Sequence, residues 1–476
     1  MRVGGALRKE DRVILMSEET KTVSEFETGN INTLILRFAI PAIIGMLCGG
    51  VQNIVNRIFV GKAVGSLALA GVQIGFPVMS IFMALSMLVG MGSMNLISIR
   101  MGQKRKEDAE RAFGQAIMLS FLVPLVVCIF FQIFLDDILM LIGATEEVLP
   151  YAHDYFRVFL WGMVFFQPSA SINNIIRAQG APNIAMGTQM LACVMNIVLN
   201  YFFVWKFGWG VQGAAWGIVL GNFCSLFWIF GYFMRGNSYL KIQFRYFRIY
   251  PRVLKAVCVL GITPFLMQLA NCVQQLIMNK SLVALGGDTA LSALSIVMSL
   301  GSVLLLPMIG FSQGGQPIMG YNYGANNYER VRKTLLRSAL YVTILAFAVY
   351  ALTMFKAESL VSIFISGEPE VEELSAHAVR LYFLGTPFVG VGVVGASLFQ
   401  ACGKAVRATL LSLSRQVLYF IPCLLILPLF IGIDGCWLAA CVSDVLSGIT
   451  TMIVCWFGLR SIKREMAERG VGQLLS

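Results

Sequence analysis

Charged residues are scarce in this sequence. Only 13% of its 476 residues are Asp, Glu, Lys or Arg, whereas 57% are hydrophobic and the mean hydropathy is +0.76. Soluble proteins carry about twice that share of charge. The few charges are grouped, and they leave apolar runs of about 20 residues, which is the length that a helix needs to cross a bilayer. The composition excludes a soluble globular protein and predicts an all-α polytopic membrane protein.

Residues that ligate metals or carry out catalysis are also few. The chain has two histidines, and none of its 11 cysteines belongs to a CxxC pair. All the cysteines lie in apolar runs, where cysteine commonly serves as a small buried hydrophobe. We therefore expect no metal site, no cofactor and no disulfide framework. Since no cluster of acids, histidines or cysteines is present, we do not expect an enzyme.

The N-terminal region lacks the apolar run of a cleavable signal peptide. We interpret residues 1–33 as a cytoplasmic leader. Met1 and Met16 are both candidate start residues, because the stretch after Met16 has the composition of an ordinary cytoplasmic leader.

Twelve hydrophobic spans follow the leader. Several of them contain proline, which a membrane helix tolerates because neighbouring helices satisfy the carbonyl groups that proline leaves free. The spans are expected at about residues 34–60, 67–99, 112–135, 151–176, 182–205, 211–234, 256–285, 289–320, 334–355, 375–402, 406–430 and 435–459.

The loops between the spans alternate in charge. The loop RMGQKRKEDAER after the second span has five basic residues, and the loop between the third and fourth spans has four acids and no base. Basic loops remain on the cytoplasmic side of a membrane. We therefore expect both termini, including the tail at residues 460–476, on the cytoplasmic side of a bacterial inner membrane.

The connection at residues 235–255 alternates aromatic and basic residues and contains six basic side chains. Such a pattern also occurs in segments that bind nucleic acid. In a membrane protein, however, a basic and aromatic linker is suited to lie on an anionic lipid surface. We expect membrane lipid, and no nucleic acid, as its partner.

The sequence repeats itself at a spacing of about 223 residues. Pro41 corresponds to Pro264, and Gly102 corresponds to Gly324. The correspondence runs through all six spans of each half, so chance does not explain it.

Each half is therefore expected to form a six-helix bundle. We define the N-lobe as residues 34–234 and the C-lobe as residues 256–459. An even number of spans in each repeat relates the two lobes by an axis along the membrane normal. Two parallel bundles with a cleft between them suit alternating-access transport.

Four stretches resemble one transporter family. They are FAIPAIIGMLCGGVQNIVNRIFVG, IIRAQGAPNIA, SQGGQPIMGYNYGANNYERVRK and FQACGKAVRATLLSLSRQVLYFIP. Over about residues 30–460 the chain resembles the multidrug and toxic compound extrusion (MATE) family, especially its bacterial MepA-like branch. The resemblance implies a 6+6 MATE fold and secondary-active export of organic compounds driven by H⁺ or Na⁺.

The resemblance also indicates a polar network in the N-lobe, formed by Gln52, Asn56, Asn173, Asn196 and Asn200. This chain has Asn56 and Asn200 where the family usually has aspartate. An amide donates and accepts hydrogen bonds but does not titrate, so we expect no proton coupling in the N-lobe. Two roles remain open for these amides, namely contacts between helices and contacts to a ligand.

Two charges lie deep in the C-lobe, Arg415 and Asp444. A lone charge at mid-bilayer costs about 3 kcal/mol or more, so we expect the two to pair. A structural ion pair and a coupling site are both open interpretations. Gln275, Asn279 and Gln400 add polar lining to the same lobe.

The leading hypothesis is an exporter of small hydrophobic, cationic organic compounds that works as a monomer. The alternative within transport is a flippase for a lipid-linked cell-envelope precursor, which the missing N-lobe acids favour and the close motif match disfavours. A membrane-embedded enzyme or a receptor is the third hypothesis.

Overall fold

The computed structural model describes residues 25–64, 66–235, 238–365 and 369–474. Within these ranges the chain is helical apart from short connections, and it contains no strand. Both candidate start residues and most of the predicted leader lie outside the described residues.

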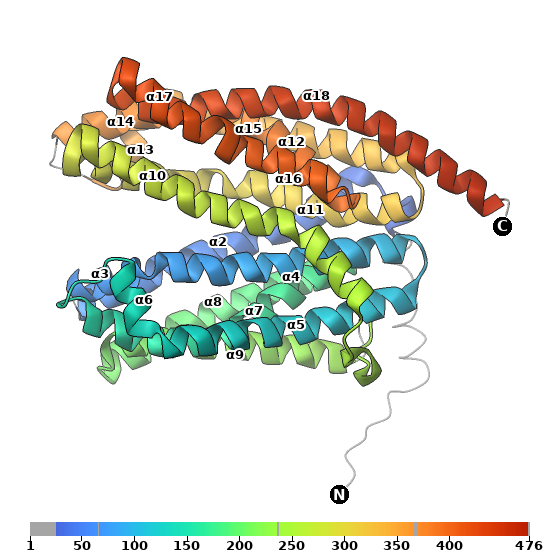
Figure 1. Cartoon of the computed structure of the whole chain (residues 1–476), viewed down its shortest axis with the longest axis horizontal. Coiled ribbons are helices and arrows are strands. Elements are labelled where there is room, and N and C mark those ends of the chain that lie inside the picture. The colour runs from blue at the N-terminus through green and yellow to red at the C-terminus, as the bar shows by residue number, and fades with distance from the viewer. Residues whose placement is uncertain (1–24, 65, 236–237, 366–368, 475–476) are drawn as a thin grey trace, which may run out of the picture.

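The first half of the chain builds the lower group of helices in Figure 1. It contains α2 (Ile31–Ala63), α3 (Ser66–Ile74), α4 (Phe76–Gly102), α5 (Lys106–Ile133), α6 (Leu135–Leu141), α7 (Leu149–Ala178), α8 (Pro182–Asn200), the π-helical segment η1 (Tyr201–Lys206) and α9 (Gly210–Met234).

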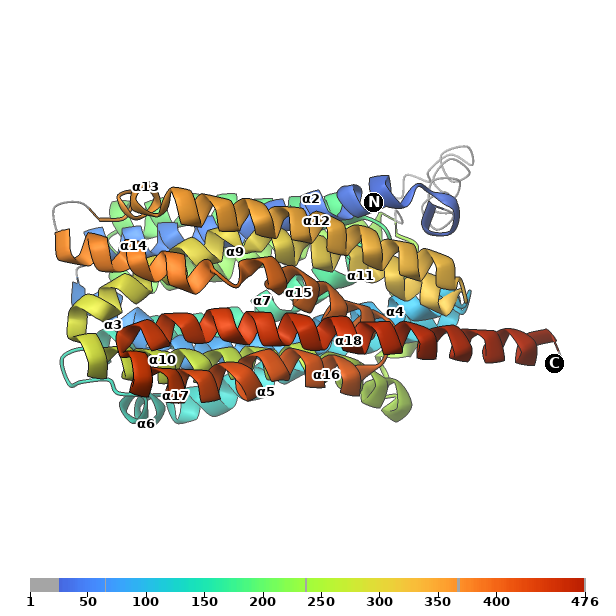
Figure 2. The ribbon, with the colours of Figure 1, turned by 90° about the horizontal axis from the view of Figure 1, so that it is seen from above.

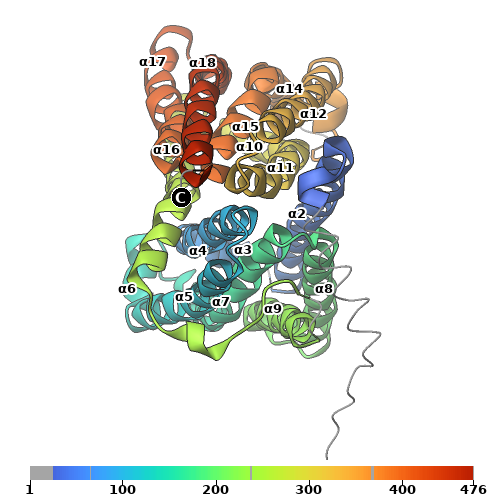
Figure 3. The same ribbon diagram turned by 90° about the vertical axis from the view of Figure 1, so that its right-hand side faces the viewer.

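The second half builds the upper group, which the end-on view of Figure 3 separates from the lower one. The 3-10 turn η2 (Phe244–Phe247) of the linker comes first and lies beside the lower group. The upper group is built from α10 (Pro251–Leu304), α11 (Leu306–Gly324), α12 (Tyr328–Phe355), α13 (Ala357–Val361), α14 (Pro369–Phe383), α15 (Thr386–Ala401), α16 (Ala405–Leu413), the π-helical segment η3 (Ser414–Phe420), α17 (Ile421–Ile431) and α18 (Ile433–Leu474). Figure 2 shows α18 extending past the ends of the other helices.

The helices account for the twelve predicted spans. Among the described residues, nine helical stretches are long and apolar enough to cross a membrane, or ten when α14 and α15 count as one bent span. One of the nine, Pro251–Gly324, contains two spans, because Gly287 leaves the helical conformation with φ 57°. The remaining span is α7, which has 30 residues. The predicted all-α fold of two six-helix bundles is confirmed.

Proline begins several of these helices instead of interrupting them. It stands in the first turn of α4, α11 and α15, where its missing N–H group would have no helical partner. Each of these helices follows a break in a predicted span. The second, eighth and tenth spans are therefore each built from two helical pieces.

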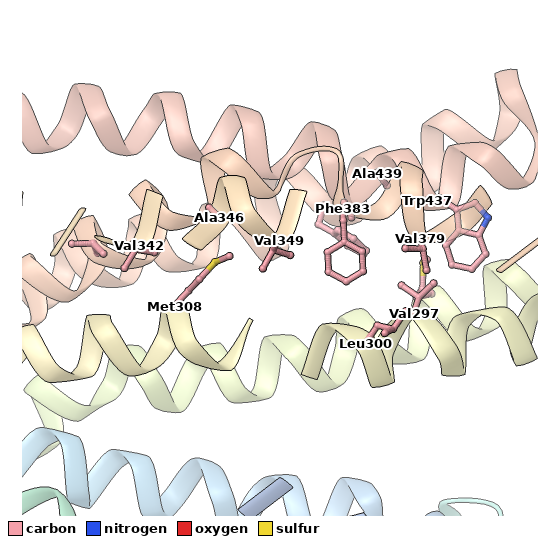
Figure 4. Close-up of a cluster of buried hydrophobic side chains, with 14 of the residues drawn as sticks. Val297, Leu300, Met308, Val342, Ala346, Val349, Val379, Phe383, Trp437 and Ala439 are labelled. Atoms are coloured by element: carbon pink, nitrogen blue, oxygen red, sulfur yellow. The ribbon is translucent and has the colours of Figure 1, made fainter. Parts of the chain in front are cut away.

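The C-lobe has a continuous apolar core. Figure 4 shows Val297 and Leu300 of α10, Phe383 at the end of α14, and Trp437 of α18 in this cluster. Trp437 is 0% exposed. The core therefore holds the end of α14, and with it the break that separates α14 from α15.

Trp437→Ala should lower the thermal stability of the purified protein strongly. Removing a buried tryptophan leaves a cavity and typically costs about 3–5 kcal/mol. The melting temperature in detergent measures the effect. Trp228→Ala is the matched control, because Trp228 is 49% exposed. If the melting temperature fell equally in both variants, Trp437 would not stabilise this core more than an exposed tryptophan does.

The two halves meet through glycines near the ends of α4 and α11. A Cβ atom on Gly102 would lie 1.9 Å from the Tyr321 carbonyl oxygen, and one on Gly324 would lie 2.1 Å from the Ile99 carbonyl oxygen. Only glycine allows backbones to approach this closely, as at other close membrane-helix crossings. The α4–α5 turn, which has the basic loop, lies at this end, so we call it the basic end.

The linker between the halves is fixed to α5. Gln115 donates to the Tyr246 carbonyl at 3.2 Å and accepts from the Tyr250 N–H at 3.2 Å. Glu110, which is buried, accepts from Gln243 at 2.6 Å. Desolvation by the surrounding chain raises the pKa of the Tyr246 hydroxyl above its ordinary value. The linker thus packs on the N-lobe before α10 begins.

Candidate functional site

Three of the predicted N-lobe amides lie together between α2 and α8. Asn200 Nδ2 is 2.6 Å from Asn56 Oδ1 and 3.1 Å from Asn196 Oδ1, and it donates to both. Asn196 and Asn200 are each 0% exposed. One helical turn separates them, so both amides face the same side of α8.

Two polar atoms of this amide cluster lack a hydrogen-bond partner among the described residues. Within the described contacts, Asn196 Nδ2 and Asn200 Oδ1 form no hydrogen bond. Buried polar atoms are nearly always paired in folded proteins. One donor and one acceptor of the cluster are therefore unpaired in this conformation, and both atoms are buried. The π-helical segment η1 begins directly after Asn200, and such segments are frequent at functional sites.

Asn173 lies apart from the amide cluster. Its Nδ2 donates to the Ala185 carbonyl at 2.7 Å, and its Oδ1 accepts from Arg177 at 3.0 Å. Asn173 therefore does not join the polar network that the resemblance indicates, because Ala185 and Arg177 occupy its side chain. Gln52 lies one turn before Asn56 on α2 and is partly buried.

Arg177 also joins the two halves of the molecule. Its Nη1 donates to Gln313 Oε1 on α11 at 2.9 Å, and its side chain is buried. Sequence reasoning missed this contact, because an arginine at the end of a span has the pattern of an ordinary cytoplasmic-side residue.

The two deep charges of the C-lobe are paired, as predicted. Arg415 Nε donates to Asp444 Oδ1 at 2.7 Å. Asp444 is 6% exposed and lies on α18, while Arg415 lies in the π-helical segment η3. The pair thus joins two membrane-spanning segments of one lobe.

The ion pair adjoins a broken helix. The helices α14 and α15 are bent by 47° at their junction, and a Cβ atom on Gly385 there would lie 3.0 Å from Asp444 Cβ. The N-terminus of α15 carries a partial positive charge, which stabilises a nearby carboxylate. Broken helices at mid-membrane form ion and substrate sites in many transporters.

The predicted C-lobe amides are dispersed. Gln400 accepts from Gln316 Nε2 at 3.1 Å. Gln275 and Asn279 lie on α10, and no hydrogen bond among the described residues joins either of them to the ion pair. Sequence reasoning missed a further, partly buried polar contact, in which Gln416 donates to Asn271.

The ion pair and the amide cluster differ in what they can bind. No group of three or more His, Cys, Asp or Glu residues in the described ranges is placed to hold a metal ion. An intramembrane carboxylate that loses its arginine must bind a proton or a cation, because an unpaired buried charge is costly. The amide cluster, by contrast, offers hydrogen bonds without charge.

Comparison with known sequences shows one family and a group of distant relatives. The family model MatE matches residues 41–202 and 265–425. The chain is similar to a protein named multidrug export protein MepA from Staphylococcus haemolyticus, at 24% identity over 437 residues, which cover 90% of this chain and 94% of the relative. A protein of the same name from Staphylococcus saprophyticus is 23% identical and covers 93% of this chain and 97% of its own length.

Solved structures of transporters share the fold. A structure described as MATE in the bent conformation superposes with a TM-score of 0.89 at 23% identity, over 94% of this chain and 99% of its own. A MOP superfamily transporter from Pyrococcus furiosus, described as having a binding pocket of reverse polarity, gives 0.88 at 24% identity over 92% and 98%. Helix arrangement is thus shared even where most residues differ.

Proposed function

This chain belongs to the MatE family, and from that membership we propose that it is a secondary-active exporter of small organic compounds. Two observations support the proposal. The family model matches both halves of the chain, and the relatives named multidrug export protein align over nearly their whole length. A multi-pass protein of this kind acts in a bacterial inner membrane, with both termini on the cytoplasmic side.

We propose alternating access between the N-lobe and the C-lobe. The glycine contact between α4 and α11 closes the basic end of the bundle in this structure. The hydrogen bond from Arg177 to Gln313 also crosses from one half to the other. These contacts must open for substrate to enter from the cytoplasm and must form again for release outside.

Coupling to an ion gradient is assigned to the C-lobe. The observation that carries this assignment is the Arg415–Asp444 pair beside the break between α14 and α15. A change in the bend at this break would alter the distance between the two charges. When the pair opens, Asp444 takes up H⁺ or Na⁺, and when it closes again the ion is released. The lobe movement and the ion movement are thereby linked.

The amide cluster of the N-lobe is assigned to substrate. Asn196 Nδ2 and Asn200 Oδ1 supply a donor and an acceptor for a polar group on an otherwise apolar compound. Because Asn56 and Asn200 do not titrate, this cluster contributes binding but no ion coupling.

Asn200→Asp should retain export and should add a second dependence on pH or Na⁺ to the one that Asp444 supplies. The change introduces one titratable group beside Asn56 and Asn196, whose amide oxygens accept from Asn200 Nδ2 in the wild type. Export rates measured at several pH values and Na⁺ concentrations test this. Asn222→Asp is the control, because Asn222 is also buried but donates to its own helix at the Ile218 carbonyl. If Asn222→Asp showed the same added dependence on pH or Na⁺, the effect would not be specific to the amide cluster.

Expression in a pump-deficient bacterial host tests the proposed function directly. We expect increased resistance to cationic dyes and other hydrophobic organic compounds, and no increase with an Asp444→Asn variant expressed at the same level. Unchanged resistance to a broad panel, together with altered cell-envelope glycans, would instead indicate a flippase.

A further inference from the structure

A cavity of about 530 Å³ lies between the ends of α4 and α5 and the first turn of α10. Figure 1 shows the α4–α5 turn and the start of α10 at the same end of the molecule. Three arginines line the cavity, namely Arg100, Arg111 and Arg252, each from a different helix. The amide cluster and the ion pair have no part in this site.

The charges of these arginines are not all compensated. Arg111 forms ion pairs with Glu107 at 2.8 Å and with Asp108 at 3.5 Å, so its charge is balanced locally. Arg100 donates to a neutral group, Gln103 Oε1, at 2.9 Å. Arg252 forms no ion pair in the part of the chain that the structure describes. The guanidinium groups of Arg100 and Arg252 can therefore bind an anion.

The fourth charged residue of the lining, Asp108, does not cancel these two cations. Its carboxylate lies 3.2 Å from Arg105 Nε and 3.5 Å from Arg111, so two arginines already share it. Arg111 also lies over the Tyr250 ring, at 5.9 Å from its centroid. The cavity as a whole therefore remains positive.

Apolar side chains form the other part of the lining. Leu96 is 8% exposed, and Val253 and Ala256 are half-buried on the first turns of α10. These residues continue into the membrane-spanning parts of α4 and α10. An occupant of this cavity therefore meets cations at one end and hydrocarbon at the other.

We propose that this cavity binds the phosphate headgroup of an anionic phospholipid. Basic pockets between helix ends at the membrane surface are suited to acidic headgroups, and guanidinium groups bind phosphate through paired hydrogen bonds. The apolar lining receives the start of the acyl chains, which a free phosphate ion lacks. A bound lipid joins α4 and α5 of the N-lobe to α10, the first helix of the C-lobe.

Native mass spectrometry of the full-length protein in detergent tests this assignment. Phosphatidylglycerol and the zwitterionic phosphatidylcholine are titrated against the wild type and the variants. Phosphatidylglycerol should bind the wild type more tightly. Arg252→Gln should weaken that binding about fivefold, since each basic residue near an anionic lipid contributes about 1 kcal/mol. Arg252 is exposed, so this substitution leaves the packed interior unchanged.

The double variant Arg100→Gln/Arg252→Gln should lose more than an order of magnitude in affinity, by about the sum of two such contributions. The matched control is Arg332→Gln/Lys333→Gln, which removes two exposed basic residues from the first turns of α12. The control should bind phosphatidylglycerol as the wild type does. Equal losses in both double variants, or full competition by excess inorganic phosphate, would overturn the assignment.

Discussion

Asp444→Asn should abolish gradient-driven export while leaving substrate binding measurable. Within the described membrane-spanning segments, Asp444 is the only carboxylate that is both buried and paired to a cation. The amide of asparagine is neutral and does not titrate, so it cannot replace the carboxylate as the group that binds H⁺ or Na⁺. Proteoliposomes with imposed H⁺ or Na⁺ gradients measure export, and binding is followed in detergent. Asp434→Asn is the matched control on the same helix, because Asp434 is half exposed and bonded to His377. The control should export normally.

Asp444→Asn also destabilises the folded protein, and this effect must be distinguished from a loss of ion coupling. It leaves Arg415 without its counter-charge, and breaking a buried pair costs about 3–5 kcal/mol. The double variant Asp444→Asn/Arg415→Gln removes both charges, so it should recover expression but not export. If either variant exports at the wild-type rate under an imposed gradient, the ion pair is structural and coupling lies elsewhere.

Gly324→Leu should prevent the basic end from closing and should abolish most export. A Cβ atom added at this position would lie 2.1 Å from the Ile99 carbonyl oxygen. That oxygen belongs to the backbone and cannot rotate away as a side chain could. Overpacking costs about 1–3 kcal/mol or more, which shifts the equilibrium against the closed state by about one to two orders of magnitude. Gly102→Leu should act in the same way, because its Cβ would meet the Tyr321 carbonyl oxygen.

Accessibility of a single cysteine measures this closure. Ser98 is 2% exposed and faces Gly320 across the same contact, so Ser98→Cys in a cysteine-free background reports on it. An impermeant thiol reagent added from the basic side should label it faster when Gly324→Leu is present. Gly187→Leu is the control, because no atom lies within 4 Å of its added Cβ. Unchanged labelling and normal export in Gly324→Leu would contradict the closing role of this crossing.

The fold was predictable from the sequence because the membrane restricts it. A bilayer requires apolar helices of a set length, and the repeat requires that both halves fold alike, so twelve spans in two bundles followed from hydropathy. The pairing of Arg415 with Asp444 followed from the cost of a lone charge in the membrane.

The details of the candidate site were less predictable, because hydropathy does not specify how helices rotate against one another. Asn173 was expected beside Asn196, yet it faces Arg177. The Arg177–Gln313 contact joins residues 136 positions apart in the sequence. The break at Gly385 also could not be located, since Pro387 has the same sequence pattern whether it kinks a helix or begins one.

Coupling through the C-lobe is tested by measuring the ion movement that substrate efflux drives. Proteoliposomes are loaded with a substrate, no ion gradient is imposed, and an internal pH or Na⁺ indicator follows the ion as the substrate leaves. Coupling through Asp444 predicts inward ion flux in the wild type, the same flux per exported substrate in Asn200→Ala, and none in Asp444→Asn. Substrate efflux without ion flux in the wild type, or undiminished ion flux in Asp444→Asn, would contradict coupling through the C-lobe.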